Sequence, residues 1–128
     1  MTSAKTAETV TVVLSLPPAG LSPNSRLHWA AKARLTRAYR ELAHAATRAA
    51  GGWKRHWPRA IATARFFFRT PRRRDEDNAR ASLKAAFDGM VDAGLLVGDT
   101  AAHLTHGRPV MAVDPGNPRV EIEVRRLA

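Results

Sequence analysis

The chain of 128 residues contains no cysteine, which excludes a disulfide-stapled scaffold and any zinc site that needs thiolate ligands. It also has few acidic residues, since 11 Asp and Glu stand against 21 Lys and Arg and give a formal net charge of +10. Most of these cations are arginine, the side chain whose planar guanidinium suits bidentate contact with phosphate. The imbalance favours a polyanion as the partner, with an anionic membrane surface as the second alternative.

Long apolar runs are absent too. The longest fall far short of the roughly 20 residues that a membrane-spanning helix needs, and residues 1–8 lack the apolar stretch typical of a signal peptide. The sequence therefore predicts a soluble, cytoplasmic protein. Its length and its apolar fraction of 45% fit a single domain over residues 1–128, in which we expect residues 1–8 to be disordered.

Apolar periodicity and turn residues predict six elements. They give an α+β fold, in which two main helices pack on a small mixed β-sheet in the order β-α-β-α-β-β. The first helix begins at Asn24 or Ser25. The expected ranges are a strand at 9–16, a helix to about 50, a strand at 59–69, a helix at 78–93, and strands at 101–113 and 119–125.

Three of the scarce acids are consecutive, at Asp75, Glu76 and Asp77. In an extended backbone Asp75 and Asp77 point the same way, and two converging carboxylates repel unless a divalent cation relieves the repulsion. Oxygen ligands without His or Cys suit Mg²⁺ or Mn²⁺. The alternative is that Asp77 and Asn78 act only as helix-cap and first-turn residues. Asp99 joins this site if the chain folds back after the second helix, and is otherwise part of an ordinary Gly-Asp turn.

Taken together, these pieces resemble the RusA family of Holliday junction resolvases, which are small endodeoxyribonucleases of bacteria, phages and prophages. The resemblance covers roughly residues 9 to 125. It rests on an arginine run followed by Asp-x-Asp-Asn over residues 72–78, on Lys-Ala-Ala-Phe-Asp over 84–88, on Ala93-Gly94, on Asp99, and on the proline-containing opening over 21–29.

The resemblance implies a homodimeric, Mg²⁺-dependent enzyme that resolves four-way DNA junctions by paired symmetric nicks in recombination and repair. Asp75, Asp77 and Asp99 match the metal-binding carboxylates, and Lys84 matches the functional lysine. Two features depart from the family. Lys84 lies one helical turn further from Asp77, and Gly98 stands where some members carry a second acid. We interpret Gly98 as a turn glycine that aims Asp99 back at the other two carboxylates.

We expect the basic residues to hold DNA phosphates, which contributes affinity and geometry but no base readout. Two alternatives stay open: a non-catalytic basic DNA-binding protein in which Asp75 and Asp77 act as caps, and a RusA-like nuclease acting on flaps or forks. The expected DNA-binding residues are Arg72, Arg73, Arg74, Asn24, Arg26, Lys32, Arg37 and Arg40.

Aromatic residues and histidines outside these motifs give weaker signals. His103 and His106 are three residues apart on an expected strand, which is a poor spacing for metal ligands, and we interpret them as structural or DNA-facing. Trp53 and Trp57 flank a basic run and serve either as loop anchors or as stacking platforms for unpaired bases. Three successive phenylalanines, Phe66–Phe68, exceed what one sheet face buries. Their strand is a candidate dimer contact unless both faces are covered within one subunit.

Overall fold

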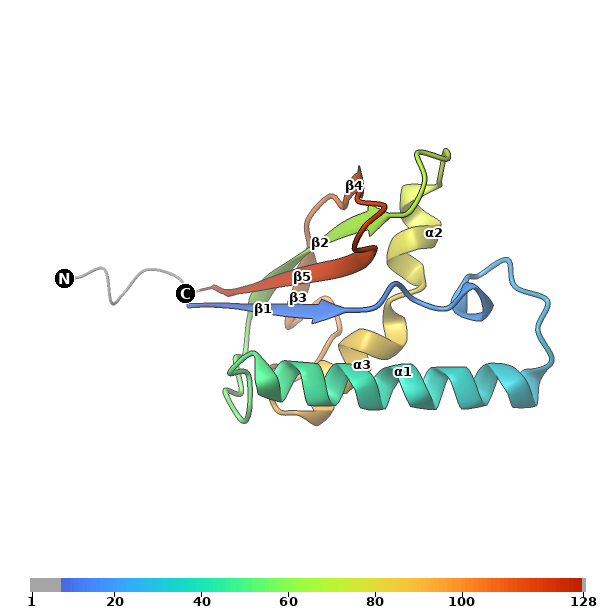
Figure 1. Ribbon diagram of the computed structural model, residues 1–128. Helices are drawn as coiled ribbons and strands as arrows, with labels where there is room; N and C mark the ends of the chain where they lie inside the picture. The colour runs from blue at the N-terminus through green and yellow to red at the C-terminus, as the bar shows by residue number, and fades with distance from the viewer. Residues whose placement is uncertain (1–7, 128) are drawn as a thin grey trace.

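The computed structural model describes residues 8–127 and confirms the α+β fold, with helices on one side of a five-stranded mixed sheet (Figure 1). The strands run in the order β1-β5-β2-β3, and β4 also pairs with β2. β5 is antiparallel to β1 and β2, whereas β3 and β4 are parallel to β2. The strands are β1 (Thr9–Leu14), β2 (Ala60–Phe68), β3 (Leu104–His106), β4 (Val110–Val113) and β5 (Arg119–Arg126).

Three α-helices and one short 3₁₀ turn complete the chain: η2 (Ala19–Leu21), α1 (Trp29–Ala49), α2 (Glu76–Ala81) and α3 (Lys84–Asp92). The prediction of disorder for residues 1–8 falls almost entirely on residues 1–7, which lie outside the described residues. Glu8 is placed, and its carboxylate pairs with Arg55 at 3.0 Å and with Arg126 at 2.8 Å.

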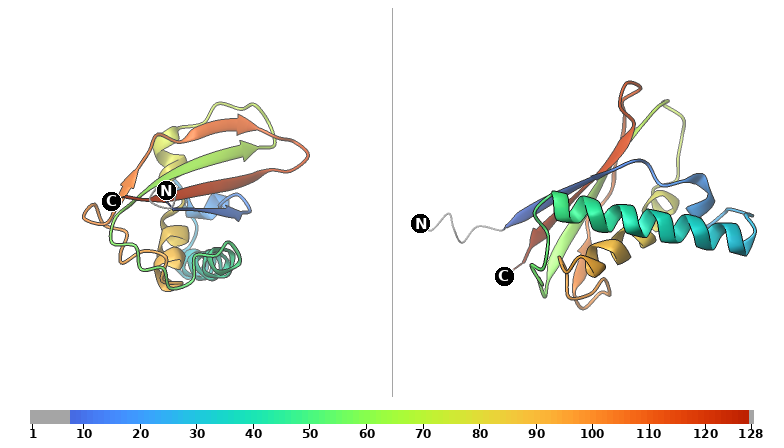
Figure 2. Two further views of the ribbon diagram at one scale, coloured as in Figure 1. Left: turned by 90° about the vertical axis from the view of Figure 1, so that its left-hand side faces the viewer. Right: turned by 60° about the horizontal axis from the view of Figure 1, so that its bottom comes forward.

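The core lies between the helices and one face of the sheet, and within residues 8–127 no helix covers the other face (Figure 2). Alternate residues of β1, β2 and β5 are buried, as a half-covered sheet requires. On the open face Arg65 lies 3.9 Å from the carboxylates of both Glu121 and Glu123. The buried strand residues are Val10, Val12, Leu14, Ala60, Ala62, Ala64, Phe66, Val120, Ile122 and Val124.

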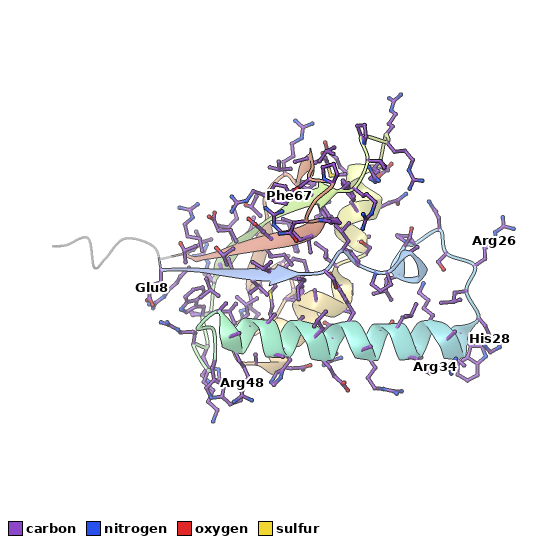
Figure 3. All side chains as sticks on the ribbon, viewed as in Figure 1. Glu8, Arg26, His28, Arg34, Arg48 and Phe67 are labelled. Carbon is purple, nitrogen blue, oxygen red and sulfur yellow. The ribbon has the colours of Figure 1, made fainter. Side chains whose placement is uncertain are left out.

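The three phenylalanines of β2 are covered by side chains of the same chain. Phe66 is buried and stacks on Phe68 with 5.6 Å between ring centroids. Phe67 lies on the open face under the Arg119 guanidinium, 4.0 Å from its ring centroid, and is labelled in Figure 3. Phe67 and Phe68 are half-buried, and the dimer contact on this strand stays a prediction, as does the dimer itself.

Helix α1 begins at Trp29, so the predicted start at Asn24 or Ser25 is wrong. His28 is the N-cap, since its Nδ1 accepts a hydrogen bond from the Ala30 amide at 3.2 Å. Ser25 instead accepts from the Leu27 amide at 3.2 Å, within the turn before the helix. A side-chain bond to a nearby amide outside the helix competes with capping and delays the start.

The second predicted helix is two helices, broken at Ser82 and Leu83. The Ser82 hydroxyl donates to the Ala79 carbonyl at 2.6 Å, and Leu83 is fully buried. The last predicted strand before β5 is also interrupted, because Gly107, Arg108 and Pro109 separate β3 from β4 and proline has no amide hydrogen for a ladder. β2 lies between β4 and β5, so these two do not form a hairpin ladder.

Candidate active site

A hollow of about 270 Å³ lies between α2, α3, β3 and the loop before β3, and we call it the α2–α3 cavity. Three of the residues predicted from the sequence reach it: Asp77, Lys84 and Asp99. They come from three separate elements, since Asp77 lies in the first turn of α2, Lys84 is the first residue of α3 and Asp99 lies in the loop. The full lining is Asp77, Arg80, Ala81, Lys84, Phe87, Asp99 and His106.

Lys84 joins two carboxylates at the mouth of the cavity. Its Nζ donates to Asp99 Oδ2 at 2.7 Å and to Asp88 Oδ1 at 2.8 Å. The hydrogen bonds to Asp88 and Asp99 raise the pKa of Lys84. The hydrogen bond from Lys84 is also the main reason why the pKa of Asp99 lies below its usual value. Both groups are therefore charged at neutral pH. The pair with Asp88 is an i, i+4 contact along α3, of the kind that is common on exposed helix faces.

Asp99 reaches Lys84 because the chain folds back sharply after α3. The break at Ser82 leaves α3 with nine residues, about 14 Å, so the return path is short. Leu95 and Leu96 are buried, and the Val97 amide donates to the Trp57 carbonyl at 3.0 Å. These contacts fix the loop that carries Asp99. The same break moves Lys84 to the start of α3, which accommodates its extra turn of spacing from Asp77.

Gly98 does not act as the turn glycine that we expected from the sequence. The described glycines with positive φ are Gly51 and Gly94, so the backbone at Gly98 is one that other residues also adopt. What the structure places against Gly98 is the His103 ring, because a Cβ built there would lie 3.0 Å from its Cδ2. A side chain at this position would press on His103 rather than strain the backbone.

Asp75 and Asp77 lie on different sides of α2, contrary to the expected extended backbone. Asp75 is the N-cap of α2, and its Oδ1 accepts from the Asn78 amide at 2.9 Å. Asp77 follows inside the helix, and its side chain is 89% exposed and lies 3.4 Å from Arg80. The helix begins between the two residues, so their side chains diverge. The capping alternative from the sequence thus describes Asp75.

The residues that face the α2–α3 cavity fit a magnesium ion held by two carboxylates. Among residues 8–127 no three His, Asp or Glu side chains are gathered as a metal-ligating group, so the predicted set of Asp75, Asp77 and Asp99 is not assembled. Asp77 and Asp99 do face the same hollow, with oxygen as their only donor atoms. Mg²⁺ is usually held by one or two carboxylates, with water and substrate phosphates completing its octahedron.

A second, larger hollow of about 600 Å³ lies on the other side of α2, and we call it the arginine groove. It brings together Arg72, Arg73, Arg74 and Asn24, which sequence analysis assigned to DNA, with Asp75 at its rim. Its complete lining is Leu16, Pro17, Pro18, Ala19, Ser22, Asn24, Ser25, Phe66, Phe68, Arg72, Arg73, Arg74, Asp75, Asn78, Ala79 and Ser82.

Arg74 is the most fixed of the three groove arginines. Its guanidinium lies 3.8 Å from the centroid of the Phe68 ring and donates to the carbonyls of Thr70 and Arg72 at 2.9 and 2.8 Å. Burial and the charge of Arg72 lower its pKa. Arg72 and Arg73 are exposed. The loop is therefore shaped by Arg74, and it presents the other two guanidinium groups to the solvent.

The remaining predicted DNA-binding residues are dispersed. Lys32, Arg37 and Arg40 line a shallow hollow along α1, and Arg26 is exposed ahead of that helix (Figure 3). Arg40 forms a two-point ion pair with Asp92, at 2.6 and 2.8 Å, which raises its pKa. A phosphate at Arg40 would have to compete with this carboxylate.

His106 and Arg80 complete the cavity, and sequence analysis did not place either of them in the site. The His106 ring meets Phe87 edge-on at 4.9 Å, and burial, followed by the charge of Arg80, lowers its pKa. His106 reaches the cavity because β3 pairs with β2, and no local sequence pattern predicts that pairing. Trp57 is 3% exposed and is a loop anchor, whereas Trp53 is 42% exposed beneath the Arg48 guanidinium.

No protein-family model matches this chain, and no curated protein is significantly similar to it. Within residues 8–127, none of the helices combines the length and the apolar character needed to cross a membrane.

Proposed function

We propose that the protein is a Mg²⁺-dependent endodeoxyribonuclease that cuts branched DNA, with the four-way junction as its foremost substrate. The observation that carries this proposal is the convergence of Asp77, Lys84 and Asp99 on one cavity from three elements. The net charge of +10 and the neighbouring arginine groove supply the attraction for a polyanion. The resemblance to RusA resolvases supports the choice of branched DNA.

In this reaction Asp77 and Asp99 would hold Mg²⁺, which when bound supplies a nucleophilic hydroxide and stabilises charge on the phosphoryl oxygens. Lys84 rests against Asp99, so its ammonium is already in the cavity when a phosphate arrives. Its Nζ would then donate to a phosphoryl oxygen in the transition state. Arg80 restrains Asp77 from the next turn of α2. Phe87 and His106 form one wall of the cavity.

Productive resolution of a four-way junction needs two symmetric nicks, and a homodimer with two-fold symmetry supplies two matched sites. We include the homodimer and a location in the cytoplasm of a bacterial or phage-infected cell in the proposal, since both follow from the resemblance. A relative that acts on flaps or forks would use the same cavity, so the substrate assay must include those branched forms.

The test is cleavage of labelled four-way junction, fork and linear duplex by wild type, with Mg²⁺ or with EDTA. We expect Mg²⁺-dependent nicks in the junction and little cleavage of linear duplex. Asp99→Asn serves as the inactive variant, and Asp114→Asn, which alters an acid paired with Arg119 outside the cavity, serves as the control. Absence of cleavage in every metal condition by a folded protein would refute the nuclease.

A non-catalytic DNA-binding protein is the second candidate, and the N-cap role of Asp75 favours it. In that case the acids after the arginine run stabilise α2 rather than bind metal. Calorimetry with Mg²⁺ or Mn²⁺ separates the two functions. A cavity that binds metal through Asp99 gives heat with wild type and none with Asp99→Asn, whereas a purely structural acid gives no metal binding in either protein.

A further inference from the structure

The arginine groove has a composition that phosphate binding alone does not require. Its floor is formed by Leu16 and by the Phe68 ring with the Arg74 guanidinium over it, and the exposed cations Arg72 and Arg73 lie beside that floor. A surface that only tracks the DNA backbone needs exposed cations and no such floor. The volume of about 600 Å³ falls within the ~300–1,000 Å³ typical of sites that enclose a small organic ligand.

We propose that the arginine groove takes one unpaired nucleotide of the DNA strand, with its base on the outer face of the Arg74 guanidinium that covers the Phe68 ring, and its phosphate at Arg72 and Arg73. This inference rests on the proposed function for its substrate, branched DNA. It goes beyond it by assigning the groove to a base rather than to duplex backbone. Bases of every kind have an apolar face that stacks on aromatic and guanidinium planes.

The charges of the groove define where each part of the nucleotide lies. Arg72 and Arg73 are exposed at one side, and the carboxylate of Asp75 is exposed at the rim. A phosphate is attracted by the two arginines and repelled by Asp75, so it lies on the arginine side. Asp75 accepts hydrogen bonds only, which suits the amino or imino groups of a base edge.

Polar groups of the N-terminal loop face the same space. Asn24 is exposed and offers an amide that both donates and accepts. The Oγ atoms of Ser22 and Ser25 accept from the Asn24 and Leu27 amides at 3.3 and 3.2 Å, so their hydroxyl hydrogens stay available to donate. This combination of a stacking floor and a few polar side chains is that of a site for an individual base.

The groove and the α2–α3 cavity share α2, which connects the inference with the chemistry. Asn78 and Ser82 face the groove, whereas Asp77 and Arg80 face the cavity. Six helical residues span only about 9 Å, so one DNA strand reaches both hollows within a few nucleotides. A base held in the groove would set which phosphate of the strand enters the cavity.

The experiment compares two duplexes that differ in a single bulged residue, one carrying a normal base and one an abasic site. Both have the same phosphates, so the ratio of their dissociation constants reports the base alone. Binding is measured in EDTA, where no cleavage occurs. We expect wild type to prefer the base-containing bulge about tenfold, as stacking of one base supplies. Asn24→Ala and Phe68→Ala should each bring the ratio close to one.

Two variants separate base recognition from charge. Arg73→Ala should weaken binding to both duplexes equally and leave the ratio unchanged. Arg125→Ala, an exposed arginine outside the groove, removes the same charge and should change neither constant more than twofold. Because Phe68 packs on Phe66, Asn24→Ala carries the test if Phe68→Ala fails to fold.

A wild-type ratio near one would overturn the inference, and so would a tenfold ratio that Asn24→Ala and folded Phe68→Ala both retain. Failure of the proposed function has a different signature. A protein that never cuts DNA with Mg²⁺ but keeps the groove-dependent ratio lacks the nuclease and retains the nucleotide site. A protein that cuts junctions with a ratio near one retains the nuclease and lacks that site.

Discussion

The two sides of α2 differ in how their charges are arranged. In the α2–α3 cavity every cation is next to a carboxylate, since Lys84 touches Asp88 and Asp99, and Arg80 lies beside Asp77. In the arginine groove three arginines face a single acid, Asp75, whose carboxylate caps a helix. Balanced charges suit a site that must hold a cation and a phosphate in turn. An excess of cations suits a site that only attracts and positions DNA.

The sharpest test of this comparison exchanges one acid from each side. Asp99→Asn should reduce single-turnover cleavage of a four-way junction by about 10²–10³-fold, the loss typical for one group acting on transition-state charge. Asp75→Asn should reduce it less than tenfold, because the new side chain still caps α2 and Asp75 faces the groove. Equal losses in the two variants would show that Asp75 turns into the cavity when metal and DNA bind.

The close packing of α3 against α1 at Gly89 gives the next largest effect. A Cβ built on Gly89 would clash with the Arg40 carbonyl oxygen and would lie 2.8 Å from the Ala43 Cβ. Helix α3 therefore contacts α1 at this glycine. Gly89→Ala should cost about 1–3 kcal/mol in the free energy of unfolding, measured by urea denaturation. It should also displace Lys84 from Asp99. Gly116→Ala, whose nearest neighbour lies at 3.8 Å, is the matched control and should be nearly neutral.

The arginine groove should account for part of the salt dependence of DNA binding. The double variant Arg72→Ala/Arg73→Ala should weaken junction binding in EDTA and make the slope of log K against log salt shallower by about two. Its control, Arg34→Ala/Arg125→Ala, removes two exposed arginines that do not line the groove. Equal changes in slope from both pairs would mean that charge acts over the whole surface and not through the groove.

The cap at Asp75 predicts a smaller effect, on stability alone. Asp75→Ala removes the acceptor for the Asn78 amide and should cost about 1 kcal/mol, whereas Asp75→Asn should cost little, since asparagine caps equally well. Thermal unfolding of the two variants measures the difference. A cost shared equally by alanine and asparagine would point to the charge of Asp75 rather than to its hydrogen bond.

The ion pair in the cavity gives the smallest effect, and its sign follows from both pKa shifts. The pKa of Asp99 in the folded protein is lowered. Its contribution to the free energy of unfolding is therefore present above the ordinary pKa of 3.8 and is lost as the pH falls through the lowered pKa. The pKa of Lys84 in the folded protein is raised. Its contribution to the free energy of unfolding is therefore present below the ordinary pKa of 10.5 and is lost as the pH rises through the raised pKa.

Wild type should therefore exceed Lys84→Met in the free energy of unfolding between about pH 4 and pH 10, and the difference should vanish in acid. It should stay below about 1 kcal/mol, because the Lys84 side chain is 68% exposed and solvent screens the pair. Urea titrations at several pH values provide the measurement. A difference that persists well below the lowered pKa of Asp99 would mean that Lys84 stabilises the fold by packing.

Local sequence patterns predicted the elements that have clear boundaries. Alternation of apolar residues located β1, β2 and β5, and Gly94 at φ +80° follows α3 directly after residue 93, where the second helix was expected to end. The start of α1 was missed because Ser25 hydrogen-bonds within its own turn and leaves the cap to His28. The break after Ala81 was missed because the Ser82 hydroxyl takes the Ala79 carbonyl and the Leu83 amide donates to the Arg80 carbonyl instead, and apolar periodicity carries no information on such bonds.

The sequence by itself determined the α+β composition and the cationic excess, since these depend on residue types and short spacings. It also offered Asp75, Asp77 and Asp99 as candidate carboxylates, and the family resemblance added Lys84. Only the tertiary structure decided which of them meet. The helix start between Asp75 and Asp77 separates the paired acids, and the short α3 with its returning loop brings Asp99 within 2.7 Å of Lys84. The physical reason is that side-chain direction depends on where a helix starts, and chain return depends on burial of loop residues such as Leu95 and Leu96, which no spacing rule contains.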